Sequence, residues 1–410
     1  MADWKRILYI VAAIQVGTGI SIIGVISFIP LFLTSELGVT DPGEAAFWAG
    51  LISGATPLFV AVAAPFWTLQ ADRRGPRFAL TMILLILTVV IFCNTFVQTP
   101  MQFLVLRLLQ GASGGFIAVG MSLVMSVTPK EKMPWAMGVF QASMVSGIMF
   151  GPLAGGIIAD SLGYRMPFLI FSALTFLCLM AVHFYIPEEM NPGQTKKREP
   201  FLVQLRCFMK NPVILLMIFI QFLCNAGMTG IGPILPLYIK EMLGDSTTIV
   251  ATLVGIIIFV SAGVSCLASL SLSRFTDRFP IVNILLVAAF VTGVNFIFQY
   301  LMPTVFTLGA VRALLGLSLG MIMPITNTIL ASAAPDSMRT MVVGFAASFS
   351  LLGNVFGPFV SGTIAMQFGY AAVFWSTAAC FFVMTAMIFA RKHLITVDLG
   401  GKEGKSEIKN

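Results

Sequence analysis

The sequence predicts an all-α membrane protein in which twelve transmembrane helices form two pseudo-symmetric six-helix bundles. Of its 410 residues, 58% are apolar and only 10% are charged. A soluble domain carries about 25% charged residues, so this chain has too few charges to cover a surface in water. Charge and turn clusters divide the chain into twelve apolar stretches, and its two halves resemble each other in sequence.

Each predicted span is long enough for a hydrocarbon core, which needs about 20 apolar residues per helix. The spans of the first half are 7–34, 46–70, 77–97, 101–127, 134–161 and 166–186. Those of the second half are 211–238, 247–273, 280–301, 304–332, 338–366 and 370–391. The basic stretch 187–210 contains Pro192 and Gly193, so we expect a cytoplasmic linker between bundles at 1–186 and 211–391, with a tail at 392–410.

The basic residues predict the orientation of the spans. Of the 24 Lys and Arg residues, 20 fall on the side of the N-terminus, whereas Arg165 and Lys240 fall on the other side and two lie within spans. Because Lys and Arg are enriched on the cytoplasmic side of membranes, this bias places both termini in the cytoplasm. The basic residues flank apolar spans, so they indicate contact with a lipid bilayer and no binding of nucleic acid.

The two halves are related by an offset of 205 or 206 residues. The offset relates Gln15 to Gln221, Pro30 to Pro236, Asp72-Arg73 to Asp277-Arg278, Arg107 to Arg312, Gly147 to Gly353, and Gly151-Pro152 to Gly357-Pro358. With six helices per half, both halves enter the membrane from the same side. Such a parallel repeat is typical of transporters whose substrate site lies between the halves near the bilayer midplane.

The sequence lacks the residues that several chemical functions require. The six Cys are scattered without a CxxC pair, and the two histidines, His183 and His393, are too far apart to suggest a metal site or a catalytic triad. No GxxxxGK[ST] phosphate loop is present. We therefore expect no enzyme, no metal and no cofactor.

Arg107 and Arg312 are the charges predicted to lie within spans. A charge at this depth costs a few kcal/mol and normally faces a cavity with a role in function. The alternative is that each side chain reaches the outer interface along its own aliphatic stem. No acidic residue lies in the middle of a span, and Glu36, at the end of the first span, is the nearest candidate for carrying a proton.

Polar amides interrupt the first helix of each predicted three-helix unit. They are Gln15, Gln110, Gln221, Asn225 and Asn327. Each amide could hydrogen-bond a ligand in a central cavity or merely bridge two neighbouring helices, and the sequence leaves both interpretations open.

Glycines crowd the fifth span in the segment GIMFGPLAGG, and part of the pattern recurs in the eleventh. The residues are Gly147, Gly151, Pro152, Gly155, Gly156, Gly353, Gly357 and Pro358. Glycines at a four-residue spacing let helices approach closely, and an internal proline bends a helix. The segment therefore predicts close packing, a hinge, or both.

The segment QADRRGPR follows the second span and is partly repeated in the second half. Taken alone, an aspartate in a tight loop is most often a solvated cap. Its repetition favours a conformational latch in which the carboxylate meets the N-terminus of a helix from the opposite half. The candidate latch residues are Asp72, Arg73, Arg77, Asp277, Arg278 and Arg339.

Three of these segments resemble the major facilitator superfamily. ADRRGPR resembles its signature between helices 2 and 3, although Thr68 replaces the first glycine and Pro76 breaks the second basic pair. RLLQGASGG is similar to its helix 4 motif with an embedded arginine. GIMFGPLAGG is similar to the helix 5 motif of the twelve-helix drug:proton antiporter branch, within which the chain most resembles bacterial inner-membrane multidrug efflux proteins.

The resemblance implies a rocker-switch exporter that works as a monomer in the bacterial inner membrane. It implies that Asp72 is a conformational latch and that Arg107 takes part in proton transfer or holds the coupling carboxylate. The leading expectation is export of amphipathic small molecules in exchange for protons. The alternative is a transporter of one metabolite, such as a siderophore, a sugar or another organic anion, because Arg107 and Arg312 could each bind an anionic group bidentately. A non-transporting sensor is a third class, against which the repeated latch and glycine motifs argue.

Overall fold

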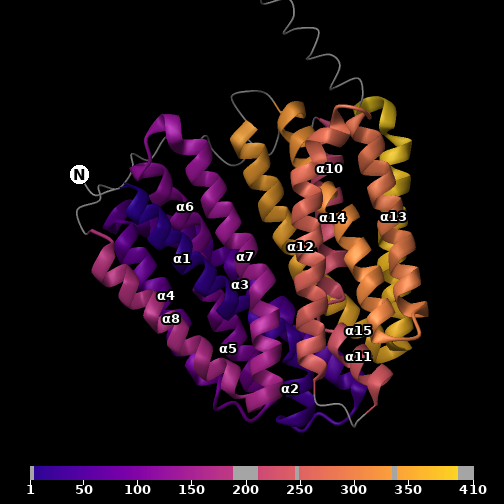
Figure 1. Cartoon of the computed structure of the whole chain (residues 1–410), viewed down its shortest axis with the longest axis horizontal. Coiled ribbons are helices and arrows are strands. Elements are labelled where there is room, and N and C mark those ends of the chain that lie inside the picture. The colour runs from indigo at the N-terminus through magenta and orange to yellow at the C-terminus, as the bar shows by residue number, and fades with distance from the viewer. Residues whose placement is uncertain (1–3, 188–210, 245–248, 335–338, 396–410) are drawn as a thin grey trace, which may run out of the picture. The chain divides into compact units, whose positions relative to one another are not determined.

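The computed structural model describes residues 4–187, 211–244, 249–334 and 339–395, and within these ranges every regular element is a helix. The chain folds into two compact units (Figure 1). The first unit comprises 1–196 and 232–259, and the second comprises 197–231 and 260–410. The division falls inside the helix α12 (Val250–Thr276). The predicted all-α fold is therefore confirmed.

The first unit contains all the described helices of the first half of the chain. They are α1 (Trp4–Ile23), the 3₁₀ turn η1 (Gly24–Ser27), α2 (Ile29–Ser35), α3 (Pro42–Arg74), α4 (Pro76–Asn94), α5 (Pro100–Ala112), α6 (Phe116–Val127), the 3₁₀ turn η2 (Lys130–Lys132), α7 (Met133–Leu162) and α8 (Met166–Tyr185). The short helix α11 (Leu235–Leu243) and the start of α12 also belong to this unit. In this unit α6 lies toward the upper end of Figure 1 and α2 toward the lower end.

The second unit contains the remaining helices of the second half. They are α10 (Pro212–Gly230), the rest of α12, α13 (Ile281–Leu301), α14 (Val305–Ala333) and α15 (Arg339–Ala390). The linker stretch 188–210 and the tail from 396 onward lie outside the described residues.

The described residues contain eleven segments that are long and apolar enough to cross a membrane. The last of them belongs to α15, whose helical conformation is interrupted at Gly369, with φ 77° and ψ 176°. A glycine occupies this position because only glycine adopts a positive φ without steric cost. Counting the two arms of α15 separately gives the twelve spans that the sequence predicts.

Three predicted spans are not single helices, contrary to expectation. The first is divided into α1, η1 and α2, and the seventh into α10 and α11. Pro30 and Pro236, which the repeat relates, both lie in the first turn after the interruption. Proline lacks the N–H that a continuous helix needs and its ring clashes with the carbonyl group four residues earlier. The same residue thus interrupts the same span in both halves.

The fourth span is interrupted between α5 and α6, at Gly115, whose φ is 148°. The interruption leaves the carbonyl group of Ala112 without its helical partner, and Trp67 Nε1 of α3 donates a hydrogen bond to it at 2.7 Å. In the second half Leu272 stands at the position of Trp67, and α14 runs without interruption. The interruption is therefore specific to the first half.

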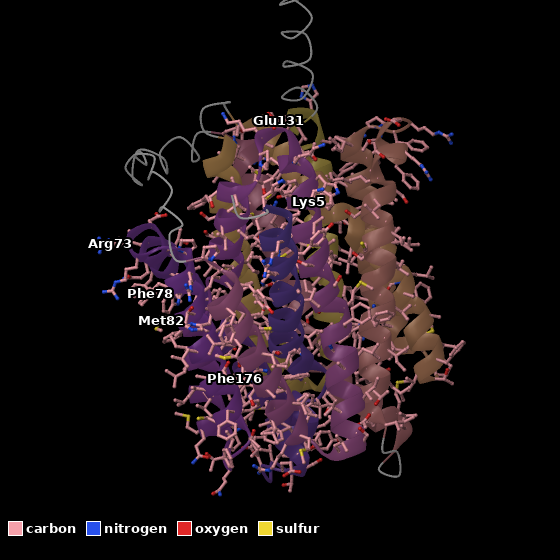
Figure 2. The ribbon with its side chains drawn as sticks, turned by 60° about the vertical axis from the view of Figure 1, so that its left-hand side comes forward. Lys5, Arg73, Phe78, Met82, Glu131 and Phe176 are labelled. Atoms are coloured by element: carbon pink, nitrogen blue, oxygen red, sulfur yellow. The ribbon has the colours of Figure 1, made fainter. Side chains whose placement is uncertain are left out.

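Aromatic side chains form the core of the first unit around α2, α5 and α8. The ring centroid of Phe32 lies 5.4 Å from that of Phe103 and 5.3 Å from that of Phe168, and all three side chains are buried. On the surface, Lys5, Arg73 and Glu131 lie toward the end at which the chain begins, whereas Phe176 lies further along the bundle (Figure 2). A surface whose large apolar side chains are exposed below a charged end is typical of a membrane-spanning bundle.

Candidate functional site

Arg107 lies on α5, and its side chain is only 4% exposed. Its Nη1 donates to Gln110 Oε1 at 3.1 Å, and the guanidinium lies over the ring of Phe103, 5.4 Å from the centroid. Thr56 Oγ1 of α3 donates to the backbone carbonyl of Arg107. Two predicted site residues, Arg107 and Gln110, are thus brought together inside the first unit.

Arg312 lies on α14 and is also buried, with 8% of the residue exposed. Its Nη1 donates to Gln299 Oε1 of α13 at 2.9 Å, and Gln299 Nε2 donates to Asn295 Oδ1 at 2.8 Å. Asn295 Nδ2 in turn donates to the carbonyl of Val311 at 2.9 Å. Sequence reasoning missed Gln299 and Asn295, although two amides four residues apart in an apolar span are a visible signal.

A second polar network in the second unit is centred on Gln221 of α10. Gln221 Nε2 donates to Asn327 Oδ1 at 2.8 Å and to Thr326 Oγ1 at 3.3 Å, both on α14. Ser350 of α15 donates to Gln221 Oε1 at 3.3 Å. The sequence predicted Gln221 and Asn327 as separate candidates, and the structure joins them and adds Thr326 and Ser350.

Asn225, the remaining amide of this network, bonds to the backbone. Its Nδ2 donates to the backbone carbonyl of Gln221 at 2.8 Å, and the backbone carbonyl of Asn225 accepts a hydrogen bond from Thr229 Oγ1. Gln221 is buried, Asn225 is half-buried and Asn327 is exposed, so the network extends from the interior of the second unit to its surface.

In the first unit, several fully buried polar atoms have no hydrogen-bond partner among the described residues. They are Gln15 Oε1, Asn94 Oδ1, Thr95 Oγ1, Arg107 Nε and Gln110 Nε2. A buried unpaired donor or acceptor costs about 1–3 kcal/mol, so such atoms in an apolar bundle need an explanation. They mark α1, α4 and α5 as the part of the first unit with unused hydrogen-bonding capacity.

The glycine-rich segment of α7 carries two stripes of residues that face different helices. Gly147, Gly151 and Gly155, four residues apart, lie against α1 and η1, where a Cβ atom would meet the backbone of Gly19 or Gly24. In the second half, Gly353 and Gly357 lie in the same way against α10, near Ala226. The predicted close packing is therefore present in both units, and α7 and α15 continue as helices through Pro152 and Pro358.

The second stripe of α7 comprises Pro152, Gly156 and Asp160 and faces the start of α12. A Cβ atom on Gly156 would meet the carbonyl of Ala251, and one on Gly255 would meet the carbonyl of Pro152 at 2.5 Å. At the end of the stripe, the Asp160 carboxylate accepts hydrogen bonds from the backbone N–H groups of Thr252 at 2.6 Å and Ala251 at 3.3 Å. Asp160 thus caps the positive end of the α12 dipole.

The candidate latch residues are placed differently from the prediction. The sequence placed Asp72 in a loop after the second span, but helix α3 continues to Arg74, so Asp72 and Arg73 lie in its last helical turn. Gly75, with φ 90°, makes the turn into α4. Arg77 Nη2 donates to the carbonyl of His183 on α8 at 2.7 Å.

The remaining latch candidates are on the second half. Asp277 and Arg278 follow α12 and are exposed, and the side chain of Arg339 lies outside the described residues.

A carboxylate in the last turn of its own helix is disfavoured by the helix dipole. Asp72 therefore occupies a position that does not serve the stability of α3.

Glu36 is the C-cap residue of α2, and its carboxylate accepts a hydrogen bond from Arg165 Nε at 2.8 Å. About a third of each side chain is exposed, at 33% for Glu36 and 34% for Arg165. Tyr164 lies nearby, and its pKa is raised by burial and further by the carboxylates of Asp160 and Glu36. Two carboxylates and one phenol thus gather at the end of the first unit opposite the N-terminus.

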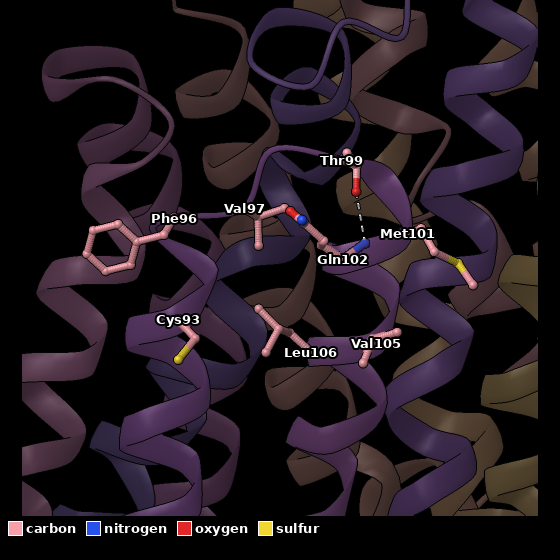
Figure 3. Close-up of a pocket in the computed structure, with 8 residues that line it drawn as sticks. All are labelled: Cys93, Phe96, Val97, Thr99, Met101, Gln102, Val105 and Leu106. Atoms are coloured by element: carbon pink, nitrogen blue, oxygen red, sulfur yellow. Dashed lines mark hydrogen bonds between the residues drawn. The ribbon is translucent and has the colours of Figure 1, made fainter.

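A pocket of about 540 Å³ opens on the first unit between the end of α4 and the start of α5 (Figure 3). It is lined by Cys93, Phe96, Val97, Thr99, Met101, Gln102, Val105 and Leu106. Gln102 N donates to Thr99 Oγ1 at 3.2 Å, which is the N-cap bond of α5. None of the site residues predicted from the sequence lines this pocket, which is a largely apolar surface hollow.

Comparison with known proteins places the whole chain in one family. Residues 11–298 and 219–408 match the model of the Major Facilitator Superfamily. The multidrug resistance protein MdtG of Salmonella dublin is 34% identical over 377 residues, which cover 92% of this chain and 93% of that protein. The MdtG protein of Salmonella typhimurium strain LT2 matches with the same identity and coverage.

Solved transporter structures share the fold at low sequence identity. A bacterial homologue of the human lysosomal transporter Spinster, in an inward-facing and occupied conformation, has a TM-score of 0.79 at 15% identity and covers 96% of this chain and 98% of its own. A D-xylose–proton symporter has a TM-score of 0.76 at 12% identity, with 93% and 96% covered. These structures show the fold, and the family model and the relatives show that the chain is no enzyme but a multi-pass membrane transporter of the major facilitator superfamily.

Proposed function

We propose that this protein exports amphipathic small molecules, drugs among them, across the bacterial inner membrane in exchange for protons. The observation that carries the proposal is the set of buried polar side chains inside apolar helices, repeated in both halves around Arg107 and Arg312. Such groups are costly in a membrane bundle and mark a substrate or ion pathway. The 34% identity to proteins named for multidrug resistance supports the same function.

Alternating access is the proposed mechanism. Residues 1–186 and 211–391 form the two bundles, joined by the cytoplasmic linker 187–210, and they alternate between two conformations during transport. The candidate substrate-binding side chains are Gln15 and Gln110 of the first half and Gln221, Asn225 and Asn327 of the second half. The tail at 392–410 and both termini are cytoplasmic, and the protein works as a monomer. The glycines and prolines of α7 and α15 let helices move against each other at short range.

The coupling machinery consists of charges at the ends and in the interior of the spans. Asp72 is the latch of one conformation, with Arg73, Arg77, Asp277, Arg278 and Arg339 as its charged surroundings. Arg107 is the intramembrane charge on which coupling depends, and Glu36 is the proposed proton carrier. The position of Asp72 at the unfavourable end of its own helix supports a role outside α3.

The test is transport by the purified full chain in liposomes with an imposed pH gradient. A panel of fluorescent amphipathic cations, neutral compounds and organic anions is followed in time, with empty liposomes as the control. We expect several unrelated compounds to move against their gradients and to stop moving when an ionophore removes the pH gradient. Absence of gradient-driven movement for every compound would overturn the proposal.

A second candidate function is transport of one organic anion in either direction. The observation that favours it is that Arg107 and Arg312 are buried cations that donate hydrogen bonds to amide side chains, and among the described residues neither guanidinium is paired with a carboxylate. A cationic substrate next to an uncompensated guanidinium is repelled, whereas an anion is attracted. Movement of a single anion and of no cation in the same panel would select this candidate.

A further inference from the structure

Two arginines from different helices meet the last turn of α8. The guanidinium carbon of Arg6, on α1, lies 5.3 Å from the centroid of the Tyr185 ring. Arg77 Nη2, on α4, donates to the backbone carbonyl of His183 at 2.7 Å. Both α1 and α4 pack along α8. Because His183 and Tyr185 belong to the same turn, α1 and α4 each place a guanidinium at the C-terminal end of α8.

The contact of Arg6 with Tyr185 positions the guanidinium without neutralising its charge. A cation over an aromatic ring at an exposed site is stabilised by about 0.5–1 kcal/mol. Stacking uses the flat face of the guanidinium, whereas its N–H groups lie along the edge. Arg6 is exposed, and it forms no ion pair in the part of the chain that the structure describes. Its edge is therefore directed to an anion from outside the described chain.

The surrounding end of the first unit carries an excess of positive charge. Figure 2 shows Lys5, Arg73 and Glu131 at this end. Its seven basic residues are Lys5, Arg6, Arg73, Arg74, Arg77, Lys130 and Lys132, and its two acidic residues are Asp72 and Glu131. A basic cluster at the end of membrane spans attracts anionic lipids by about 1 kcal/mol per Lys or Arg near the surface.

An exposed apolar stripe runs along α8 toward this charged end. Ile170, Leu177 and Phe184 recur at a spacing of seven residues, so they share one face of the helix. Leu177 is 65% exposed and Phe184 is 72% exposed. Phe184 lies between His183 and Tyr185, the two residues that the arginines contact. Positive charge at the end of an apolar stripe matches the headgroup and acyl chain of one lipid molecule.

The second half of the chain does not repeat the two arginines. The offset of the repeat relates Arg6 to Pro212 and Arg77 to Val282. The general enrichment of basic residues on one side of a membrane acts on both halves alike, so it does not explain a pair that only the first half has. The arrangement around α8 is therefore specific to the first unit.

We propose that the C-terminal end of α8, with Arg6 of α1 and Arg77 of α4, is a binding site for an anionic phospholipid. The unbridged oxygens of its phosphate accept hydrogen bonds from the guanidinium edges, and its acyl chains lie along the exposed stripe of α8. A lipid held in this way connects three helices at one end of the first unit and stabilises them against each other. The site is separate from the residues proposed to bind substrate and to couple transport to protons, apart from Arg77.

The test measures lipid binding to the full chain in detergent, without transport. The protein is titrated with dioleoyl phosphatidylglycerol and, separately, with dioleoyl phosphatidylcholine, which has the same chains and a zwitterionic headgroup. Native mass spectrometry measures bound lipid, and thermal unfolding measures stabilisation. We expect phosphatidylglycerol to bind about tenfold more tightly and to raise the melting temperature more. Equal binding of the two lipids would overturn the proposal.

Inorganic phosphate and glycerol 3-phosphate separate a lipid site from a site for a free anion. Both carry the anionic group without acyl chains, so neither should raise the melting temperature at the concentrations at which phosphatidylglycerol does. Stabilisation by inorganic phosphate equal to that by phosphatidylglycerol would overturn the assignment to a lipid.

Two double variants with the same loss of charge locate the site. Arg6→Gln with Arg77→Gln should remove the preference for phosphatidylglycerol, whereas Arg391→Gln with Lys392→Gln, at an exposed end of the second unit, should retain it. Arg6→Lys with Arg77→Lys keeps the charge and should retain most of the preference. The ratio of the two lipid affinities within one variant is compared, since Arg77→Gln also removes a bond to α8. An unchanged ratio in the first double variant, or an equal loss in the second, would contradict a site at α8.

Discussion

At the scale of single residues, glycines of the same helical bundle serve different purposes. A Cβ atom on Gly111 of α5 would lie 2.5 Å from the carbonyl oxygen of Thr56 and 2.6 Å from Phe59 Cβ, so the absence of a side chain there permits the contact with α3. Gly138 of α7 has nothing within 4 Å of such a Cβ. The close contact with α3, rather than a need for backbone flexibility, explains why residue 111 is a glycine.

Gly111→Ala is therefore expected to destabilise the protein. Overpacking against a backbone carbonyl costs about 1–3 kcal/mol, which exceeds the gain of about 1 kcal/mol from replacing a helical glycine. Gly138→Ala, the matched control, should leave the melting temperature unchanged or raise it. Thermal unfolding of both variants in detergent checks this, and an unchanged melting temperature for Gly111→Ala would contradict the close contact.

Glu36 is the second residue with a sharp expectation. Its ion pair with Arg165 is partly exposed, and exposed pairs contribute about 0–1 kcal/mol, so Glu36→Gln should barely change the melting temperature. If Glu36 carries the proton, the same variant should abolish substrate-driven proton movement in liposomes. Glu44→Gln, which removes another exposed carboxylate of the first unit, should retain it. Normal coupling in Glu36→Gln would exclude Glu36 as the carrier.

The sequence predicted the polar residues of the site better than their partners. Arg107, Arg312 and Gln221 stand out because they depart from an apolar background. Which group completes their hydrogen bonds depends on how helices pack, and that is not visible in hydropathy. The repeat offset, however, relates Asn94 to Gln299, so the sequence did contain a signal that the two halves differ at this position.

At the scale of elements, the spans were predictable and their interruptions were not. Hydropathy counts apolar residues and is blind to whether a span is one helix or two. Pro30 and Pro236 at equivalent positions were the available signal for the interruptions in the first and seventh spans. The interruption at Gly115 depends on a contact with another helix, the hydrogen bond of Trp67 to Ala112, and no local pattern predicts it.

Trp67→Phe tests that contact. The substitution keeps an aromatic ring and removes the N–H donor, leaving the carbonyl of Ala112 unpaired at a cost of about 1–3 kcal/mol. Trp48→Phe is the control, because Trp48 donates to an exposed carboxylate of Glu44 at 3.3 Å. We expect a lower melting temperature for Trp67→Phe alone. Equal melting temperatures for the two variants would show that the hydrogen bond does not stabilise the interruption.

The cap of α12 by Asp160 is a second element-scale expectation. Asp160→Asn removes the charge that faces the helix N-terminus and should loosen the contact between α7 and the start of α12. Asp41→Asn makes the same chemical change at the N-cap of α3, where the carboxylate serves its own helix. Amide hydrogen exchange should rise several-fold in residues 250–259 for Asp160→Asn only. Unchanged exchange there would contradict the cap.

At the scale of the whole molecule, the repeat organises the chain but its copies have diverged. Both halves keep the close helix contacts of Gly147 and Gly353. They differ at single polar residues: Asp160 corresponds to Met366, and Asn94 to Gln299. The sequence revealed the symmetry, whereas the structure shows where the symmetry ends and how each departure changes a hydrogen bond.

The aspartates of the repeated loop are expected to be unequal as well. Asp72 lies in the last turn of α3 at the unfavourable end of the helix dipole, whereas Asp277 lies beyond the end of α12 and is exposed. Asp72→Asn should slow transport at least tenfold without lowering the melting temperature, and Asp277→Asn should slow it less. Flux measurements in liposomes compare the two variants, and equal rates would contradict a latch specific to the first half.

The central claim is that substrate export is exchanged for protons, and one measurement tests it most directly. Purified protein in liposomes is given a substrate from the panel while lumenal pH and lumenal substrate are recorded together. We expect lumenal pH and lumenal substrate to change at the same time, in a fixed ratio, and neither to change in empty liposomes. Substrate movement with no change in lumenal pH would contradict proton exchange.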